Sequence, residues 1–185
     1  MNTVVTSKED ILKTSRELIQ QQGWSAINIR SVAAACGVSV GSIYNYFDSK
    51  AALVGATVES VWGEVFHRSE DGAVFQDTLA CITWMYGQME FGSKRYPGFF
   101  TLHSLGFMQE DKSDGKRRMQ QTWQHILDEL CCVLKRDTRI RTGAFTEQFT
   151  AERFADVVFS LMLSALLRQD YDPAAVLEIV RRTLY

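Results

Sequence analysis

Apolar residues recur at spacings of three and four along almost the whole chain, which is the period of an amphipathic helix. No stretch alternates between apolar and polar residues beside a hairpin turn, as a half-buried strand would. The pattern therefore predicts an all-α protein of about nine helices. The expected ranges are 7–22, 29–36, 40–47, 49 to about 68, 74–91, 97–108, 114–136, 151–169 and 173–183.

Local signals at the helix ends sharpen the first part of this prediction. Ser7 stands three residues before Asp10, the arrangement of a capping box, and Gly23 ends the first helix. Asn28 can cap a short second helix, because its side-chain oxygen accepts from the exposed N–H groups of the first turn. Gly37 can supply the left-handed backbone conformation that a tight turn into a third helix needs.

The second and third helices have the spacing of a helix-turn-helix. The core of this motif can be formed by Val32 and Ala33 on its first helix, Val38 in the turn and Ile43 on its second helix. The outward face of the third helix would then carry hydroxyl, amide, methyl and aromatic groups, which suit the major groove of DNA. The spacing alone would also fit a helical hairpin with an ordinary polar surface. The outward residues are Ser39, Val40, Ser42, Tyr44, Asn45 and Tyr46.

The run from Gly37 to Lys50, GVSVGSIYNYFDSK, resembles the signature of tetracycline-repressor-type (TetR family) regulators. The resemblance covers residues 8–55; the rest matches only in being helical and of suitable length. It implies that Tyr44, Tyr46 and Lys50 contact DNA, mostly at phosphates, and that Arg30 reaches a base edge. Val40 departs from the family pattern, in which Lys, Arg or Thr is common. With Asn28, the expected DNA contacts are Asn28, Arg30, Ser39, Val40, Ser42, Tyr44, Asn45, Tyr46 and Lys50.

We accordingly expect a three-helix DNA-binding domain at residues 1–50 and a helical ligand-binding and dimerisation domain at residues 51–185. The stretch 157–167 is apolar around nearly its whole circumference, so it must be covered on all sides, either by a partner or by its own core. The resemblance implies a dimer built as a four-helix bundle from the last two helices. Its expected residues are Phe154, Val158, Leu161, Met162, Ala165, Val176, Ile179 and Val180.

The region between these two parts is unusually aromatic. A cavity lined by several of its rings and a few polar groups would suit an apolar or aromatic small molecule. Plain packing is the alternative for each of these side chains. The expected ligand-binding residues are Trp62, Phe66, Trp84, Gln88, Phe100, His103, Phe107 and Trp123.

Charge and composition add limits. The net charge is −2 and residues 1–50 are nearly balanced, so charge alone does not indicate nucleic acid. The first residues do not resemble a signal peptide, and no apolar stretch approaches the roughly 20 residues of a membrane span, which predicts a cytoplasmic protein without a membrane partner. The four cysteines lack metal-ligand spacing, so we expect neither a metal nor a cofactor. They are core residues or, alternatively, redox sensors.

The sequence thus predicts a homodimeric regulator, acting as a repressor, that binds palindromic double-stranded operator DNA and is released by a small-molecule effector. A repressor switched by oxidation or alkylation of Cys81, Cys131 or Cys132 is a variant of this hypothesis. An enzyme using His103 or His125 with a cysteine is a second class, but no nucleophile elbow or phosphate loop accompanies these residues, and we do not expect an enzyme. A helical interaction module that binds no DNA is a third class.

Overall fold

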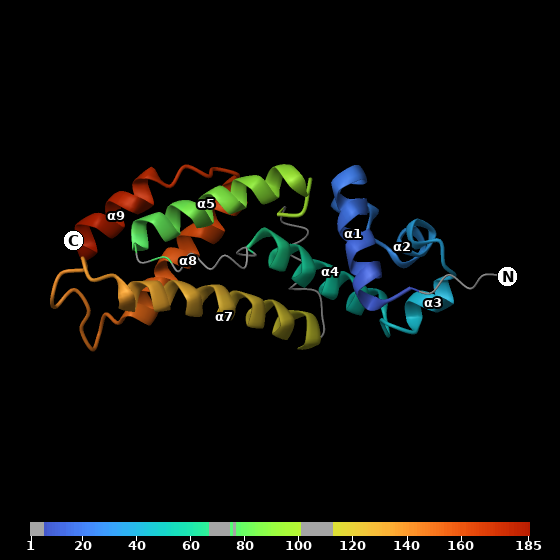
Figure 1. Cartoon of the computed structure of the whole chain (residues 1–185), viewed down its shortest axis with the longest axis horizontal. Helices are drawn as coiled ribbons and strands as arrows, with labels where there is room; N and C mark the ends of the chain where they lie inside the picture. Colours follow the sequence, from blue (N-terminus) through green and yellow to red (C-terminus); the bar gives the residue numbers. More distant parts are fainter. Residues whose placement is uncertain (1–5, 67–74, 76, 101–112) are drawn as a thin grey trace. The chain divides into compact units, whose positions relative to one another are not determined.

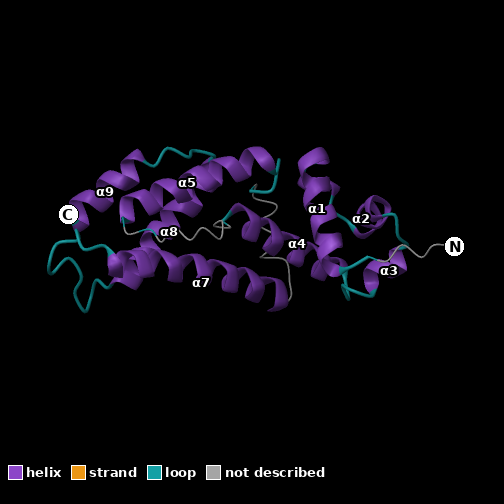
Figure 2. Ribbon diagram, in the orientation of Figure 1, coloured by secondary structure: helices purple, strands orange, loops and turns teal. Residues whose placement is uncertain are grey.

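The computed structural model describes residues 6–66, 75, 77–100 and 113–185. Within these ranges the chain forms eight α-helices and one short 3₁₀ helix, and no strand (Figures 1 and 2). The all-α prediction is confirmed. The residues fall into two compact units, one made of the chain up to Val65 together with 92–122, the other of 66–91 with 123–185.

The first unit begins with the helices that the sequence indicated best. Helix α1 (Lys8–Gln22) has Ser7 as its N-cap, with both hydrogen bonds of the capping box to Asp10. A 3₁₀ turn, η1 (Trp24–Ala26), leads to α2 (Ile29–Cys36), α3 (Val40–Tyr44) and α4 (Lys50–Val65). Apolar side chains from all four helices pack into one core, among them Ile11, Leu18, Ile19, Val32, Ile43 and Leu53.

Two of these helices end earlier than the sequence predicted. Helix α3 ends at Tyr44 rather than Phe47, because the backbone N–H groups of Tyr46 and Phe47 both turn back to the carbonyl of Ile43. This turn places the Phe47 ring in the core, 3% exposed, and lets α4 start directly afterwards. Helix α4 ends at Val65 instead of about residue 68, and residues 67–74 lie outside the described ranges.

The chain returns to the first unit at the end of α5 (Thr78–Arg95). Gly92 packs so closely here that an added Cβ would come within 2.9 Å of Val65 and 3.0 Å of Phe100. The predicted helix at 97–108 is not present at 97–100, which form a turn in which Gly98 has a φ of 77°. Residues 101–112 lie outside the described ranges. The helix predicted at 74–91 starts later, at Thr78, because the Asp77 carboxylate accepts from the N–H groups of Leu79 and Ala80.

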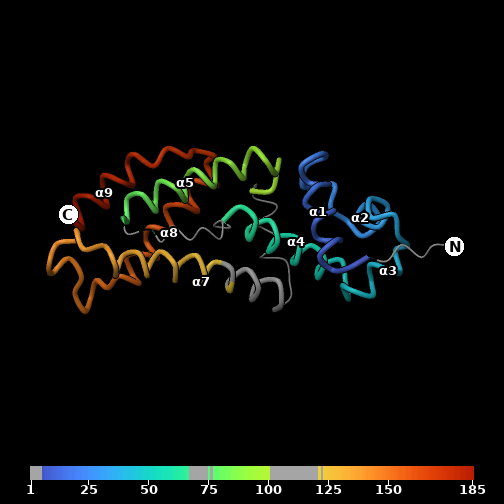
Figure 3. The backbone as a smooth tube through the Cα atoms, in the orientation of Figure 1, coloured from blue at the N-terminus to red at the C-terminus, as the bar shows by residue number. Residues whose placement is uncertain are grey.

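The second unit contains the first part of α5, the second part of α7 (Ser113–Arg136), α8 (Ala151–Arg168) and α9 (Ala174–Leu184). Figure 3 traces the long loop that leads from α7 to α8. The predicted bounds of α7, α8 and α9 are confirmed to within a residue. Thr150 caps α8 through a hydrogen bond from the N–H of Arg153.

A buried carboxylate ties the ends of three helices together in this unit. Asp137, which follows α7, accepts from the backbone N–H of Thr78 at 2.9 Å, from the Arg139 guanidinium at 3.1 Å and from the hydroxyl of Tyr185. Arg139 also pairs with Asp77 at 2.5 Å. Burial would raise the pKa of the Asp137 carboxyl, but these hydrogen bonds outweigh it and hold that pKa well below its usual range.

Candidate nucleic-acid interface and ligand pocket

The helix-turn-helix is held by caps at both ends of α2. The side-chain oxygen of Asn28 accepts from the N–H groups of Arg30 and Ser31, each at 3.0 Å. Gly37 ends α2 with a φ of 67°, the left-handed conformation predicted for the turn. Val32, Ala33 and Ile43 are buried between the helices, so the turn has a firm apolar base.

The predicted DNA contacts lie on the outside of this motif. Arg30, Ser39, Val40, Tyr44, Asn45, Tyr46 and Lys50 are exposed, whereas Asn28 and Ser42 are half-buried. Val40, Tyr44 and Tyr46 are among the few large hydrophobic side chains that the described residues leave exposed. Such a group of exposed aromatic and apolar side chains beside hydroxyl and amide groups is typical of a surface that another molecule covers.

Several of these side chains already have partners within the chain. The Oγ of Ser39 accepts from the N–H of Ser42 at 3.1 Å and so caps α3. The Tyr46 hydroxyl donates to the carbonyl of Thr6, which holds the segment before α1 against the motif. Asn28, with its side-chain oxygen occupied by the cap, is placed to position α2 rather than to reach DNA freely. Four of the predicted DNA contacts are best placed to reach a partner, because the described contacts give their side chains no hydrogen bond or ion pair. They are Arg30, Tyr44, Asn45 and Lys50.

Lys50 stands at the first position of α4. The Oγ of Ser49 accepts from the N–H of Ala52 at 3.1 Å, so the hydroxyl satisfies one of the unpaired amide groups at the start of this helix. The first N–H groups of an α-helix have no partner within the helix, and here residues 48–51 are exposed. A helix start with spare N–H groups and an adjacent ammonium is well suited to a phosphate.

The sequence analysis did not single out Gly41 as a functional residue. A Cβ at Gly41 would meet only the Oγ of Ser39, at an ordinary 3.6 Å, so packing within the chain does not require glycine there. Glycine inside a helix nevertheless costs about 1 kcal/mol relative to alanine. Its exposed place on α3, between Val40 and Ser42, fits a close approach of the backbone to another molecule. A glycine inside the helix predicted at 40–47 was the signal available in the sequence.

The candidate ligand-binding residues divide between the two units. In the first unit Trp62 packs edge-on against Phe100, with ring centroids 5.4 Å apart, and both are buried. In the second unit Phe66 packs against Trp84 at 6.2 Å, and Trp123 packs against Phe159 at 5.7 Å. Gln88 is half-buried on α5. His103 and Phe107 lie outside the described residues.

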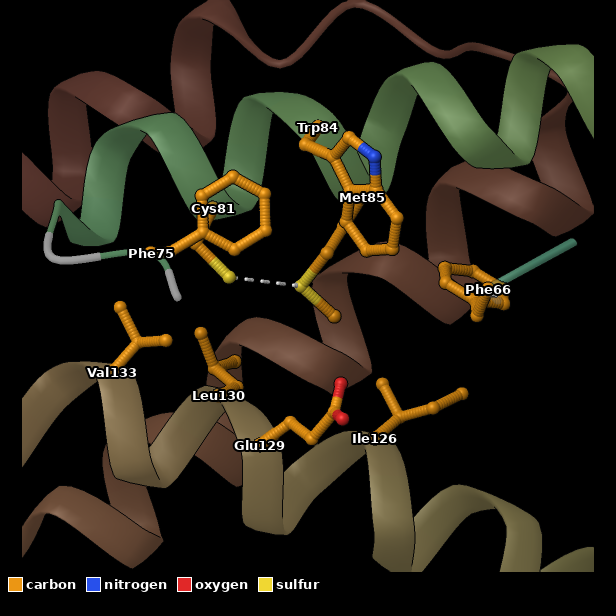
Figure 4. Close-up of a pocket in the computed structure, with 9 residues that line it drawn as sticks. All are labelled: Phe66, Phe75, Cys81, Trp84, Met85, Ile126, Glu129, Leu130 and Val133. Carbon is orange, nitrogen blue, oxygen red and sulfur yellow. Dashed lines mark hydrogen bonds between the residues drawn. The ribbon is translucent and has the colours of Figure 1, made fainter. Parts of the chain in front are cut away.

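A pocket opens between α5 and α7 within the second unit (Figure 4). Counting the part that is open to solvent, it spans about 310 Å³ of empty space, of which little is enclosed. Of the candidates that the structure describes, only Phe66 and Trp84 line it. The other lining residues could not be predicted from the sequence, because an apolar residue that lines a pocket has the same helical spacing as one that fills a core. The described lining residues are Phe66, Phe75, Cys81, Trp84, Met85, Ile126, Glu129, Leu130 and Val133.

Most of the expected dimerisation residues are already buried inside the single chain. Only Leu161, half-buried, and Ile179, about half exposed, present surface to a partner. The other six pack in the core of their own chain, and the interface itself stays a prediction. Val157 and Leu167 provide the exposed apolar surface of α8 instead. The six buried residues are Phe154, Val158, Met162, Ala165, Val176 and Val180.

The cysteines are separate and all four are free thiols. Cys81 and Cys131 are buried, and burial raises the pKa of the Cys131 thiol, which disfavours the reactive thiolate. Cys132 is exposed. Among the described residues there is no group of three or more side chains that could hold a metal ion, and no helix is long and apolar enough to cross a membrane.

Known proteins resemble the chain in two ways. Residues 11–57 match the family model "Bacterial regulatory proteins, tetR family". Over 47 residues the chain is 45% identical to the uncharacterised HTH-type transcriptional regulator YerO of Bacillus subtilis, a match that covers 25% of this chain and only 16% of that protein. It is 27% identical to the nucleoid occlusion factor SlmA of Vibrio cholerae over 149 residues, 77% of this chain and 73% of the other.

Two solved structures share the fold over nearly the whole chain. The reduced form of E. coli NemR has a TM-score of 0.68 at 20% identity, covering 96% of this chain and 97% of that one. The Bacillus subtilis regulator FadR in complex with stearoyl-CoA has a TM-score of 0.63 at 15% identity, covering 94% and 95%.

The capped α2–turn–α3 motif, its exposed face and the all-helical fold are those of a helix-turn-helix transcription regulator. The family match lies on these same helices. Over residues 11–57 the chain has the helix-turn-helix region of the TetR family of transcriptional regulators.

Proposed function

We propose that the protein is a homodimeric repressor that binds a pseudo-palindromic operator through α2 and α3 and leaves it when a small molecule binds the second unit. The observation that carries this proposal is the exposed face of α3, with Val40, Tyr44 and Asn45 beside the hydroxyls of its cap, in a chain with the helix-turn-helix region of the TetR family. Residues 1–50 would contact the DNA, and residues 51–185 would hold the effector and the second copy.

The proposed contacts differ in kind. Lys50 and the start of α4 would hold phosphates, which set the affinity for any DNA sequence, while Arg30 and the face of α3 would contact base edges, which set discrimination. Val40 offers a methyl surface that fits the methyl group of thymine. Residues 1–50 carry only five lysine and arginine side chains, so the loss of one phosphate contact should be visible in the salt dependence.

Fluorescence anisotropy with the DNA upstream of its own gene, measured over a series of salt concentrations, tests the DNA-binding part. Lys50→Ala should reduce the slope of log affinity against log salt by roughly one unit. Lys94→Ala, which removes an exposed lysine from α5, is the matched control and should leave the slope unchanged. Wild-type protein that shows no salt-dependent binding would favour the helical interaction module instead.

The dimer proposal follows from apolar surface that the single chain leaves uncovered. Val157 and Leu167 on α8 and Ile179 on α9 are each about half exposed. Leu161 and Ser164 lie between them on the face of α8, and the small serine would permit close approach of a second helix. A two-fold dimer would bury this face and present two copies of α3 to the two halves of a palindrome.

Leu161→Glu tests this interface. A carboxylate buried between two copies without a partner is strongly unfavourable, so the variant should sediment as a monomer and lose operator binding. Gln148→Glu adds the same charge at an exposed position before α8 and should remain dimeric. A Leu161→Glu protein that still sediments as a dimer would place the interface elsewhere.

Helix α4 offers a route from the effector to the DNA. Its Glu64 pairs with Arg16 of α1 at 2.6 Å and with Arg95 at 3.2 Å, so α4 is tied to the first helix of the DNA-binding part. Trp62 is buried on the same helix. Phe66, which directly follows the last residue of α4, lines the pocket. A ligand that moves Phe66 would act on α4 through the chain itself. About 1.4 kcal/mol of differential ligand binding would suffice for each tenfold loss of operator affinity.

A further inference from the structure

The pocket between α5 and α7 combines aromatic rings with a single ionisable side chain. Trp84 lies in contact with both Phe75 and Phe66, with centroid distances of 5.5 and 6.2 Å. Among the lining residues that the structure describes, Glu129 is the only one that carries a charge. The remaining lining is aliphatic or sulfur-containing, so the chemistry of the pocket rests on these rings and this carboxylate.

Glu129 is directed toward the rings rather than away from them. It shares one face of α7 with Ile126 and Leu130, and Figure 4 shows its carboxylate extending from that face toward α5, on the side where Met85 and Trp84 lie. Its side chain is 43% exposed. A carboxylate beside apolar groups loses part of its hydration, which is unfavourable unless a positive group or a hydrogen-bond donor compensates it.

The partner that the chain itself offers does not fill the pocket. His125 lies one turn earlier on α7, with its Nε2 at 3.6 Å from the Glu129 carboxylate, and its side chain is 77% exposed. It is a cation only when protonated, and it is not part of the lining. Among the described lining residues, no positive group meets the side of the carboxylate that faces the rings, which leaves that side to a charge brought by a ligand.

We infer that the pocket binds a small organic cation, a substituted ammonium with aromatic or alkyl groups. The faces of tryptophan and phenylalanine rings attract cations through their quadrupole, and the carboxylate adds a direct charge interaction. An anionic ligand would meet repulsion from Glu129, and a neutral one would leave the carboxylate uncompensated. The inference rests on the proposed function only in taking this pocket as the effector site; it narrows the expected ligand from apolar or aromatic to cationic.

Isothermal titration calorimetry with two isosteric probes tests the inference on the full-length protein without DNA. Benzyltrimethylammonium carries the charge, and 2,2-dimethylpropylbenzene has the same shape without it. The cation should bind about tenfold more tightly than its neutral isostere, a preference of the size expected for combined ring and carboxylate contacts. Equal binding of the two probes, or no binding of the cation, would overturn the inference.

Substitutions locate the effect. Glu129→Gln keeps the shape of the side chain and should remove most of the preference for the cation while leaving the neutral probe unaffected. Asp128→Asn is the matched control. Asp128 directly precedes Glu129 on α7, is exposed, accepts a hydrogen bond from Gln124 at 2.8 Å and is not among the lining residues. Loss of the preference in both variants to the same extent would mean a general surface charge effect and would contradict the assignment to Glu129.

A separate measurement distinguishes this inference from the proposed function. Operator binding is followed with and without benzyltrimethylammonium in wild type and in Glu129→Gln. If benzyltrimethylammonium releases DNA from wild type but not from Glu129→Gln, the result supports both the inference and the proposed function. Cation binding with the expected preference but without any effect on DNA would leave the pocket assignment standing and contradict its role as the effector site.

Discussion

The exposed face of α3 and the pocket of the second unit both contain aromatic and apolar side chains, but these side chains have different roles in the two regions. On α3, Tyr44 is 48% exposed and contributes little to its own core, while Ile43 beside it is fully buried. In the pocket, Trp84 and Met85 line the cavity and at the same time pack α5 against its surroundings. Stability and recognition therefore fall on different residues in the first region and on the same residues in the second. Substitutions should separate the two properties at the DNA surface and mix them around the aromatic clusters.

The largest expected contrast is between two aromatic residues. Trp62 is 2% exposed and contacts the rings of Phe99 and Phe100, so Trp62→Ala should reduce the free energy of unfolding by about 3–5 kcal/mol. Tyr44→Ala should change it by no more than about 0.5 kcal/mol and instead weaken operator binding. Urea denaturation and anisotropy on both variants measure the contrast. A Tyr44→Ala protein as destabilised as Trp62→Ala would abolish the distinction.

Asp137 should make the second unit sensitive to acid. Because its folded pKa lies below the unfolded value of about 3.9, the ionised carboxylate stabilises the fold above that value and the contribution is lost as the pH falls. Asp137→Asn should lower the free energy of unfolding at pH 7 by roughly 2–3 kcal/mol. The difference between wild type and variant should shrink from about pH 5 downward. A difference that stays constant down to pH 3 would contradict the assignment.

Arg30 should affect discrimination without affecting the fold. It is exposed on the first turn of α2, so Arg30→Ala should leave the denaturation midpoint unchanged. If its guanidinium reaches a base edge, the preference at one base pair of each half-site should fall by roughly 1–3 kcal/mol. Binding to a set of operators with single base changes measures this. Uniform weakening across the whole set would show that Arg30 contacts a phosphate instead.

Gly41 provides the smallest and sharpest test, because the two properties should move in opposite directions. Gly41→Ala should stabilise the protein by up to about 1 kcal/mol, since alanine favours the helix and its Cβ has room beside Ser39. Operator affinity should fall, because the added methyl group keeps the backbone of α3 from the DNA. Stabilisation with unchanged operator affinity would show that glycine is not required by the interface.

Where local chemistry decides the structure, the sequence was sufficient. The capping box at Ser7, the Asn28 cap and the positive φ of Gly37 each depend on residues within a few positions of one another, so they could be predicted directly from the sequence. The end of α3 was misjudged because the turn after Tyr44 is set by the need to bury Phe47, a contact with the core rather than a local preference.

Only the tertiary structure decided which residues of the second unit are buried, which are exposed and which line the pocket. Helical periodicity shows which residues of α8 share a face, but not whether that face meets its own chain or another, and burial within the chain was needed to separate Val158 from Val157. Glu129 joins Trp84 and Phe75 across more than forty residues of sequence, so no local pattern marks it as part of a pocket. Caps and turns are formed by neighbours in sequence, whereas pockets and exposed faces are formed by neighbours in space. For this reason the helix-turn-helix could be predicted from the sequence, and the chemistry of the pocket could not.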